Sequence, residues 1–167
     1  MMPLVDKITE SQIIIAEDGL KPVIHGFFDR YRATHQSLSI EELQTLRKKE
    51  REAIAFVRAQ QPPAFTPDDQ AVTYLNARCS LYQVALKQYA RGIRQWAHVW
   101  AAKLAHESRH LKGDHDELSA YTYEVDLLTV YRSAGLLKGA VFDQYIKYVT
   151  SGLHDVSSQN RIVLATR

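Results

Sequence analysis

The sequence predicts a mainly α-helical fold, a single-domain helical bundle with little or no sheet. Apolar residues recur with the helical period of about 3.6 along most of the chain. Residues that start or stop helices flank these periodic stretches, and few segments alternate as half-buried strands do. The 167 residues are enough for one domain, residues 1–167, to bury a core without disulfides.

The first third of the chain contains two predicted helices after an ambiguous start. Residues 12–15 are rich in isoleucine and fit either a short strand or the buried part of a helix. Apolar residues with helical spacing predict a helix over about residues 21–35. Ser39 and Glu42 have the spacing of a capping box. A second helix is therefore expected from this cap to about residue 60.

The middle of the chain predicts a loop followed by long helices. Residues 60–65 include two prolines and read as a loop. Residues 66–69, Thr-Pro-Asp-Asp, combine an N-cap, a proline at the first helical position and two acids, which predicts a long helix over residues 67–90. Gly92 kinks this helix or separates it from the next one, expected over residues 93–112.

The last third predicts two more helices. Lys112 and Gly113 are expected to close the preceding helix, since Gly is the usual residue just beyond a helix end. The acids that follow favour a helix over residues 116–134, ended by Gly135. A last helix is expected over residues 138–150, and the tail reads as a strand or an ordered strap.

Composition and charge exclude several classes of partner. The formal net charge is +2, and the longest basic cluster, residues 47–49, is flanked by glutamates, so nothing indicates a nucleic-acid face. No apolar run approaches the length of a membrane span. The first ten residues lack the charged and then apolar pattern of a secretory signal. We therefore expect no nucleic acid and no membrane as partners, and a location in the cytoplasm of the producing cell or export by a route that reads no such signal.

Cysteine usage points to a reducing compartment. Cys79 is the one cysteine, so no intrachain disulfide can form. It lies in a helical pattern and is interpreted as a small buried residue, not as a nucleophile.

The chemistry of this sequence is concentrated in residues 104–124. His106 and His110 are separated by one helical turn, so both imidazoles point the same way on a helix. Glu107 directly follows the first histidine, which completes the pattern His-Glu-x-x-His. Two neutral imidazoles can bind one Zn²⁺, and the adjacent carboxylate can take a proton from water on that ion.

A third zinc ligand is expected from the acid-rich segment that follows. Glu117 would lie level with His110 if the two helices run antiparallel, and Glu124 lies two turns deeper. Asp116 and its neighbour His115 are further candidates. Spacing alone leaves these four alternatives open.

Residues 104–124 resemble the core of gluzincin-type zinc metallopeptidases. In that family a glutamate on the second helix completes the site, often with a small residue three places later. Glu117 and Ala120 match these two positions. The alternative spacing, with Asp116 in the third place, is similar to metzincins, but the only methionines are Met1 and Met2, so the methionine turn is missing.

The resemblance implies a zinc-dependent hydrolase, a small metallopeptidase or amidase that acts on a peptide or amide substrate. It implies Zn²⁺ as cofactor, held by one helix pair over residues 93–134. Glu107 would be the general base, and a hydrogen-bond donor would face the developing oxyanion. The candidates for this donor are Tyr121, Tyr131 and His154, and those for an acid that orients a ligand histidine are Glu124 and Asp126.

Two other classes of function compete with this prediction. Glu107 and His110 also have the spacing found in di-iron carboxylate bundles, a class of metal-binding protein without peptidase activity. That class needs a second such pair, which the sequence lacks. The other rival is a non-enzymatic helical interaction protein, in which the two histidines are partly exposed helix residues.

Overall fold

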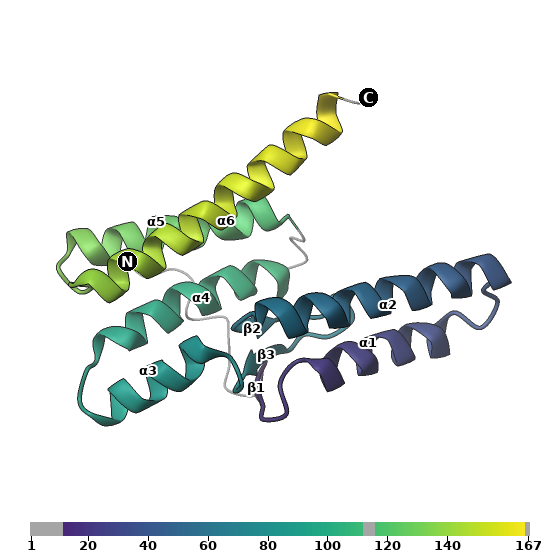
Figure 1. Ribbon diagram of the computed structural model, residues 1–167, viewed down its shortest axis with the longest axis horizontal. Coiled ribbons are helices and arrows are strands. Elements are labelled where there is room, and N and C mark those ends of the chain that lie inside the picture. The colour runs from purple at the N-terminus through teal and green to yellow at the C-terminus, as the bar shows by residue number, and fades with distance from the viewer. Residues whose placement is uncertain (1–11, 112–115, 166–167) are drawn as a thin grey trace. The chain divides into compact units, whose positions relative to one another are not determined.

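The structure is a computed structural model that describes residues 12–111 and 116–165 (Figure 1). Within these residues the chain is mainly helical, with six α-helices and one small three-stranded sheet. This confirms the predicted fold class. The chain divides into two compact units, one over Glu10–Leu86 and the other mainly over Lys87–Arg167, and the expectation of one domain stays a prediction.

The first unit combines the sheet with two helices. Strand β1, Ile13–Ala16, pairs in parallel with β3, Thr73–Asn76, and β2, Ala64–Phe65, pairs antiparallel with the other edge of β3. Helices α1, Lys21–Thr34, and α2, Ile40–Gln60, lie between β1 and β2 in the sequence and pack against each other. The isoleucine-rich start is therefore a strand.

Helix α2 begins where the sequence predicts it. The hydroxyl of Ser39 accepts a hydrogen bond from the backbone N–H of Glu42 at 3.2 Å, and the carboxylate of Glu42 accepts one from the backbone N–H of Ser39 at 2.7 Å. Both halves of the capping box are present. A core cluster then joins α1 to α2; its buried members are Leu20, Ile24, Phe28 and Val57.

The prediction of one long helix over residues 67–90 is wrong in its first half. Strand β3 lies inside this range, and helix α3 is limited to Ser80–Ala90. Thr66 does not cap a helix; its hydroxyl lies 2.9 Å from the hydroxyl of buried Thr73. The pairing of β3 with a strand far away in the sequence outweighs the local helix-start signal. Cys79, just before α3, is buried as expected.

The second unit contains the segment with the histidines. Helices α4, Gln95–Leu111, and α5, Glu117–Ser133, pack against each other, and α5 also packs against α6, Ala140–Ala165. Gly92 (φ 85°) lies between α3 and α4, and Gly135 (φ 72°) follows α5. Both adopt the left-handed conformation that glycine permits without strain, so Gly92 separates two helices and Gly135 ends one.

Two expectations about the ends of these helices have different outcomes. The stop signal at Lys112 and Gly113, together with His115, lies outside the described residues. The tail predicted as a strand or strap is instead a continuation of α6 to Ala165, because no Gly or Pro after Gly152 interrupts the helix. None of the helices in the described residues combines the length and the apolar character needed to span a bilayer.

Candidate metal centre

Helix α4 presents the two histidines of the motif on one buried face. His106 is 3% exposed, and its ring centroid lies 5.2 Å from that of His110. Small residues make this burial possible: Ala102 and Ala105 on α4 and Ala120 on α5 are buried, so the two helix backbones can approach closely. Ala120, which has the position where the resemblance expects a small residue, is thus buried.

Helix α5 begins at the acid that the resemblance selects. Glu117 is its first residue, and the preceding Asp116 is the N-cap, whose carboxylate accepts hydrogen bonds from the backbone N–H groups of Leu118 (3.1 Å) and Ser119 (3.3 Å). The side chains of Arg109 and Ser119 join α4 to α5 through a hydrogen bond of 2.8 Å. These contacts fix the first turn of α5 beside the histidines.

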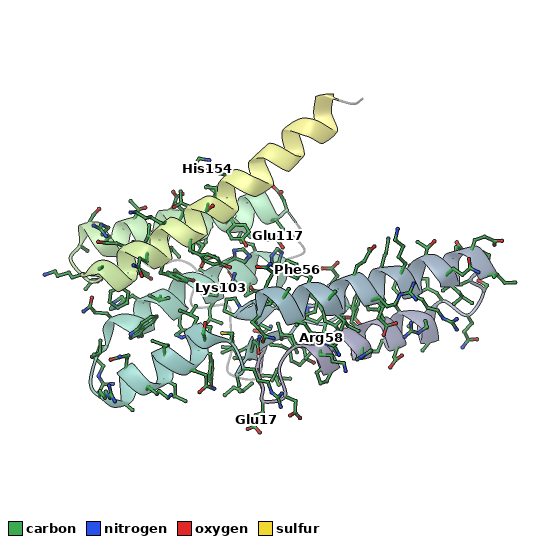
Figure 2. All side chains as sticks on the ribbon, in the orientation of Figure 1. Glu17, Phe56, Arg58, Lys103, Glu117 and His154 are labelled. Carbon is green, nitrogen blue, oxygen red and sulfur yellow. The ribbon has the colours of Figure 1, made fainter. Side chains whose placement is uncertain are left out.

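Three side chains converge between α4 and α5. The Nε2 atoms of His106 and His110 each lie 3.5 Å from a carboxylate oxygen of Glu117. One ligand atom from each of the three residues lies within 4.8 Å of the others. Ligands at about 2.0–2.2 Å from a tetrahedral zinc lie about 3.3–3.6 Å from one another. The two 3.5 Å contacts are made to different oxygen atoms of Glu117, so the three side chains would have to draw closer together to bind one zinc ion; Figure 2 marks Glu117 on α5.

Glu124 lies behind His106, on the other ring nitrogen. Its Oε2 atom is 3.0 Å from Nδ1 of His106, and its Oε1 atom accepts a hydrogen bond of 2.9 Å from the hydroxyl of Tyr145 on α6. Nδ1 and Oε2 make no hydrogen bond of good geometry with each other or with any other group of the described residues, so their contact is chiefly electrostatic. Glu124 thus has the place of an acid that orients a ligand histidine, while Asp116 caps α5.

Glu107 is turned toward a buried lysine that the sequence analysis did not select. Its Oε1 atom lies 3.4 Å from Nζ of Lys103, and the same Nζ lies 3.6 Å from Oε2 of Glu124. Lys103 is 7% exposed and comes from α4 (Figure 2). A signal existed in the sequence, because Lys103 shares the apolar stripe of α4 with Val99 and His106. We call Lys103, His106, Glu107, His110, Glu117 and Glu124 the His–Glu cluster.

Charge interactions lower the pKa of Glu117 and of Glu124. Burial raises the pKa of Glu124, but Lys103 and His106 outweigh burial and lower that pKa to about 2. Contact with His106 is the main cause of a lowered pKa at Glu117. Burial lowers the pKa of Lys103, but the nearby carboxylates raise it above its ordinary value. Burial and Lys103 also lower the pKa of His106, yet the contacts with Glu117 and Glu124 leave that pKa raised.

The three candidates for the oxyanion donor have different surroundings. The ring of Tyr121 meets His106 edge-on, with centroids 4.7 Å apart, and burial raises the pKa of its hydroxyl. Tyr131 instead contacts His98, with centroids 5.1 Å apart. His154 is an exposed residue of α6 (Figure 2). Tyr121 therefore has the strongest geometric case among the three.

Comparison with known proteins assigns no family to this chain. No family model, curated protein or solved structure matches the chain significantly. The resemblance to gluzincin-type peptidases therefore stays a prediction based on residues 104–124. The chemistry of the site has to follow from the side chains themselves.

Proposed function

We propose that this protein is a zinc-dependent hydrolase that cleaves a peptide or amide bond, with His106, His110 and Glu117 as zinc ligands. The observation that carries the proposal is the convergence of these three ligand atoms within 4.8 Å. Imidazole nitrogen and carboxylate oxygen are ordinary zinc ligands, and three protein ligands are typical of catalytic zinc sites.

The charge of the cluster supports a divalent cation. Its three carboxylates and one ammonium give a net charge of −2 when both imidazoles are neutral. His106 and Glu124 are nearly fully buried, where uncompensated charge is costly. A doubly charged ion would bring the cluster to neutrality, which a monovalent ion would not.

The surroundings of His106 give a second line of support. Glu124 faces Nδ1 of His106, so an N–H at that position leaves the lone pair on Nε2 directed toward Glu117. Metal-binding histidines commonly have a carboxylate on the nitrogen that does not bind the metal. Among the described residues Nδ1 of His106 has no hydrogen bond of good geometry, and Oε2 of Glu124 lies 3.0 Å from it.

The roles of the remaining residues follow from the reaction. Zinc in such a site acts as a Lewis acid and lowers the pKa of water bound to it. Glu107 would accept the proton of the attacking water and pass it to the leaving amine. For this step the carboxylate of Glu107 has to leave its contact with Lys103, whose Nζ atom lies 3.4 Å away. Tyr121 would donate a hydrogen bond to the oxyanion.

The ion pair between Glu107 and Lys103 favours a second candidate function. A carboxylate that stays with a buried ammonium cannot serve as a general base. In that case zinc would be structural, linking α4 to α5 in a metal-binding helical protein without hydrolase activity. The two functions share the metal site and differ in whether Glu107 takes part in a reaction.

Metal analysis of the purified chain tests the shared step. We expect about one zinc per chain and a higher melting temperature with zinc, because a ligand that binds only the folded state stabilises it. His110→Gln should lose both effects. His154→Gln, which removes an exposed histidine outside the cluster, should keep both. A wild-type chain without zinc and without a gain in melting temperature would favour the non-enzymatic interaction protein.

A further inference from the structure

Lys103 is a charged residue in a place where a helix usually carries an apolar one. It is 7% exposed and lies on the buried stripe of α4, next to the fully buried Ala102. A buried ammonium is retained only with close counter-charges. Lys103 has two, because its Nζ atom lies 3.4 Å from Glu107 and 3.6 Å from Glu124.

Lys103 contacts two carboxylates that have different proposed roles in the site. Glu107 is the proposed base and comes from the same helix, one turn after Lys103. Glu124 comes from α5 and faces Nδ1 of His106 at 3.0 Å. The same oxygen atom of Glu124, Oε2, contacts both Lys103 and His106. The ammonium is therefore separated from a zinc ligand by a single carboxylate.

The two oxygen atoms of Glu124 have different anchors. The hydroxyl of Tyr145 donates a hydrogen bond to Oε1, whereas Oε2 has no hydrogen bond of good geometry among the described residues and lies 3.6 Å from Nζ of Lys103 and 3.0 Å from Nδ1 of His106. Without the ammonium, the carboxylates of Glu107 and Glu124 would share a buried region with no lysine between them. Electrostatic repulsion would then drive Oε2 away from its place behind His106.

We propose that Lys103 is a positioning residue of the zinc site, whose ammonium holds Glu124 against Nδ1 of His106 and thereby directs Nε2 of His106 toward the ion. This inference rests on the proposed function, because it needs zinc at His106, His110 and Glu117. Lys103 touches neither zinc nor substrate. Lys103 acts through Glu124, and its ammonium also holds the carboxylate of Glu107 in its observed position.

The test measures zinc affinity by competition with a chromophoric chelator, together with the visible absorption of the Co²⁺-substituted protein. Lys103→Met should weaken zinc binding by about 10- to 100-fold, the usual effect of losing a group that orients a ligand, and should change the Co²⁺ bands. Lys147→Met, which removes an exposed lysine of α6, should leave both unchanged.

A double-mutant cycle separates positioning from general support of the fold. If Lys103 acts through Glu124, then Lys103→Met should weaken zinc binding less than about threefold in a Glu124→Gln background. If Lys103→Met alone does not fold, Lys103→Met/Glu107→Gln removes one charge of each sign and with it the repulsion between the two carboxylates. Because the attraction of Lys103 for Glu124 is still lost, zinc binding should be weaker than in Glu107→Gln, and equal affinity in the two variants would overturn the role of Lys103.

Unchanged zinc affinity in Lys103→Met, or losses that add fully in the cycle, would overturn the role of Lys103 and leave the zinc site standing. An unsubstituted chain that binds no zinc would overturn the proposed function and the role of Lys103 together. The two failures are thus distinguishable from the wild-type measurement alone.

Discussion

Glu107 and Glu117 carry the same charge but have different surroundings. Glu107 is 3% exposed and faces Lys103, whereas the side chain of Glu117 is 54% exposed and lies between the two histidines. The exposed acid thus has the surroundings proposed for a metal ligand, whereas the buried one would have to leave Lys103 to accept a proton in its proposed role as base. This difference makes the two roles separable by substitution.

Glu107→Gln should abolish hydrolysis while zinc stays bound, because an amide keeps the size of the side chain and cannot accept the proton. General bases typically contribute about 10²- to 10⁴-fold to the rate. Cleavage of a peptide mixture, followed by mass spectrometry, measures the loss beside metal content. Glu41→Gln, the same change at an exposed position of α2, is the control. Activity that survives in Glu107→Gln would refute its assignment as the base.

Glu117→Ala should weaken zinc binding more than Glu124→Ala does. The first change removes a ligand atom, whereas the second removes an acid that contacts only the far nitrogen of His106. We expect Glu124→Ala to cost about 10- to 100-fold in affinity and Glu117→Ala to cost more. Chelator competition measures both. The reverse order would make Glu124 the third ligand.

At the scale of elements, α6 supports the site by passing close to Tyr121. A Cβ atom on Gly152 would lie 3.1 Å from Cε1 of Tyr121, and the same ring meets His106 edge-on with centroids 4.7 Å apart. Gly152 therefore allows α6 to lie against a ring that itself contacts a candidate zinc ligand.

Gly152→Ala should lower the stability of the protein by about 1 kcal/mol. Overpacking costs about 1–3 kcal/mol, and the better helix propensity of alanine returns at most about 1 kcal/mol. Thermal unfolding measures the net effect. Ser151→Ala, at the exposed neighbouring position, is the control and should be neutral or slightly stabilising. A stability gain in Gly152→Ala would show that the ring of Tyr121 moves aside freely.

The capping box of α2 is an element whose contribution can be measured separately. Ser39→Ala removes the side-chain acceptor for the N–H of Glu42 and should lower the free energy of unfolding by about 1 kcal/mol. Urea denaturation measures this. Ser37→Ala, in the turn before the helix, should have little effect. Equal losses in the two variants would contradict the assignment of Ser39 as the N-cap.

At the scale of the whole molecule, features that depend on residues close together in the sequence were predicted better than features that depend on residues far apart. The start of α2 followed from Ser39 and Glu42 because a cap depends on residues within one turn. Strand β3 was missed because its partner β1 lies across two helices in the sequence. The continuation of α6 was missed because polar residues near its end suggested a tail.

The candidate site followed the same rule. The spacing of His106 and His110 was readable because both lie on one helix, whereas Glu117 was selected among four candidates only through the family resemblance. Lys103 was missed because a buried charge is recognisable only with its counter-charges, and Glu124 comes from the next helix. Sequence periodicity placed Lys103 on the buried face, and Glu107 four residues later could have indicated an ion pair within α4, but the contact with Glu124 depends on how the two helices pack.

The central claim is that two imidazoles and the carboxylate of Glu117 bind one zinc ion. X-ray absorption at the zinc K-edge of the zinc-loaded chain tests this most directly, because imidazole scattering reveals how many histidines bind the metal. We predict two imidazole nitrogens and carboxylate oxygen at about 2.0–2.2 Å, with one imidazole lost in His110→Gln. A spectrum with fewer than two imidazoles in the wild-type protein would contradict the account.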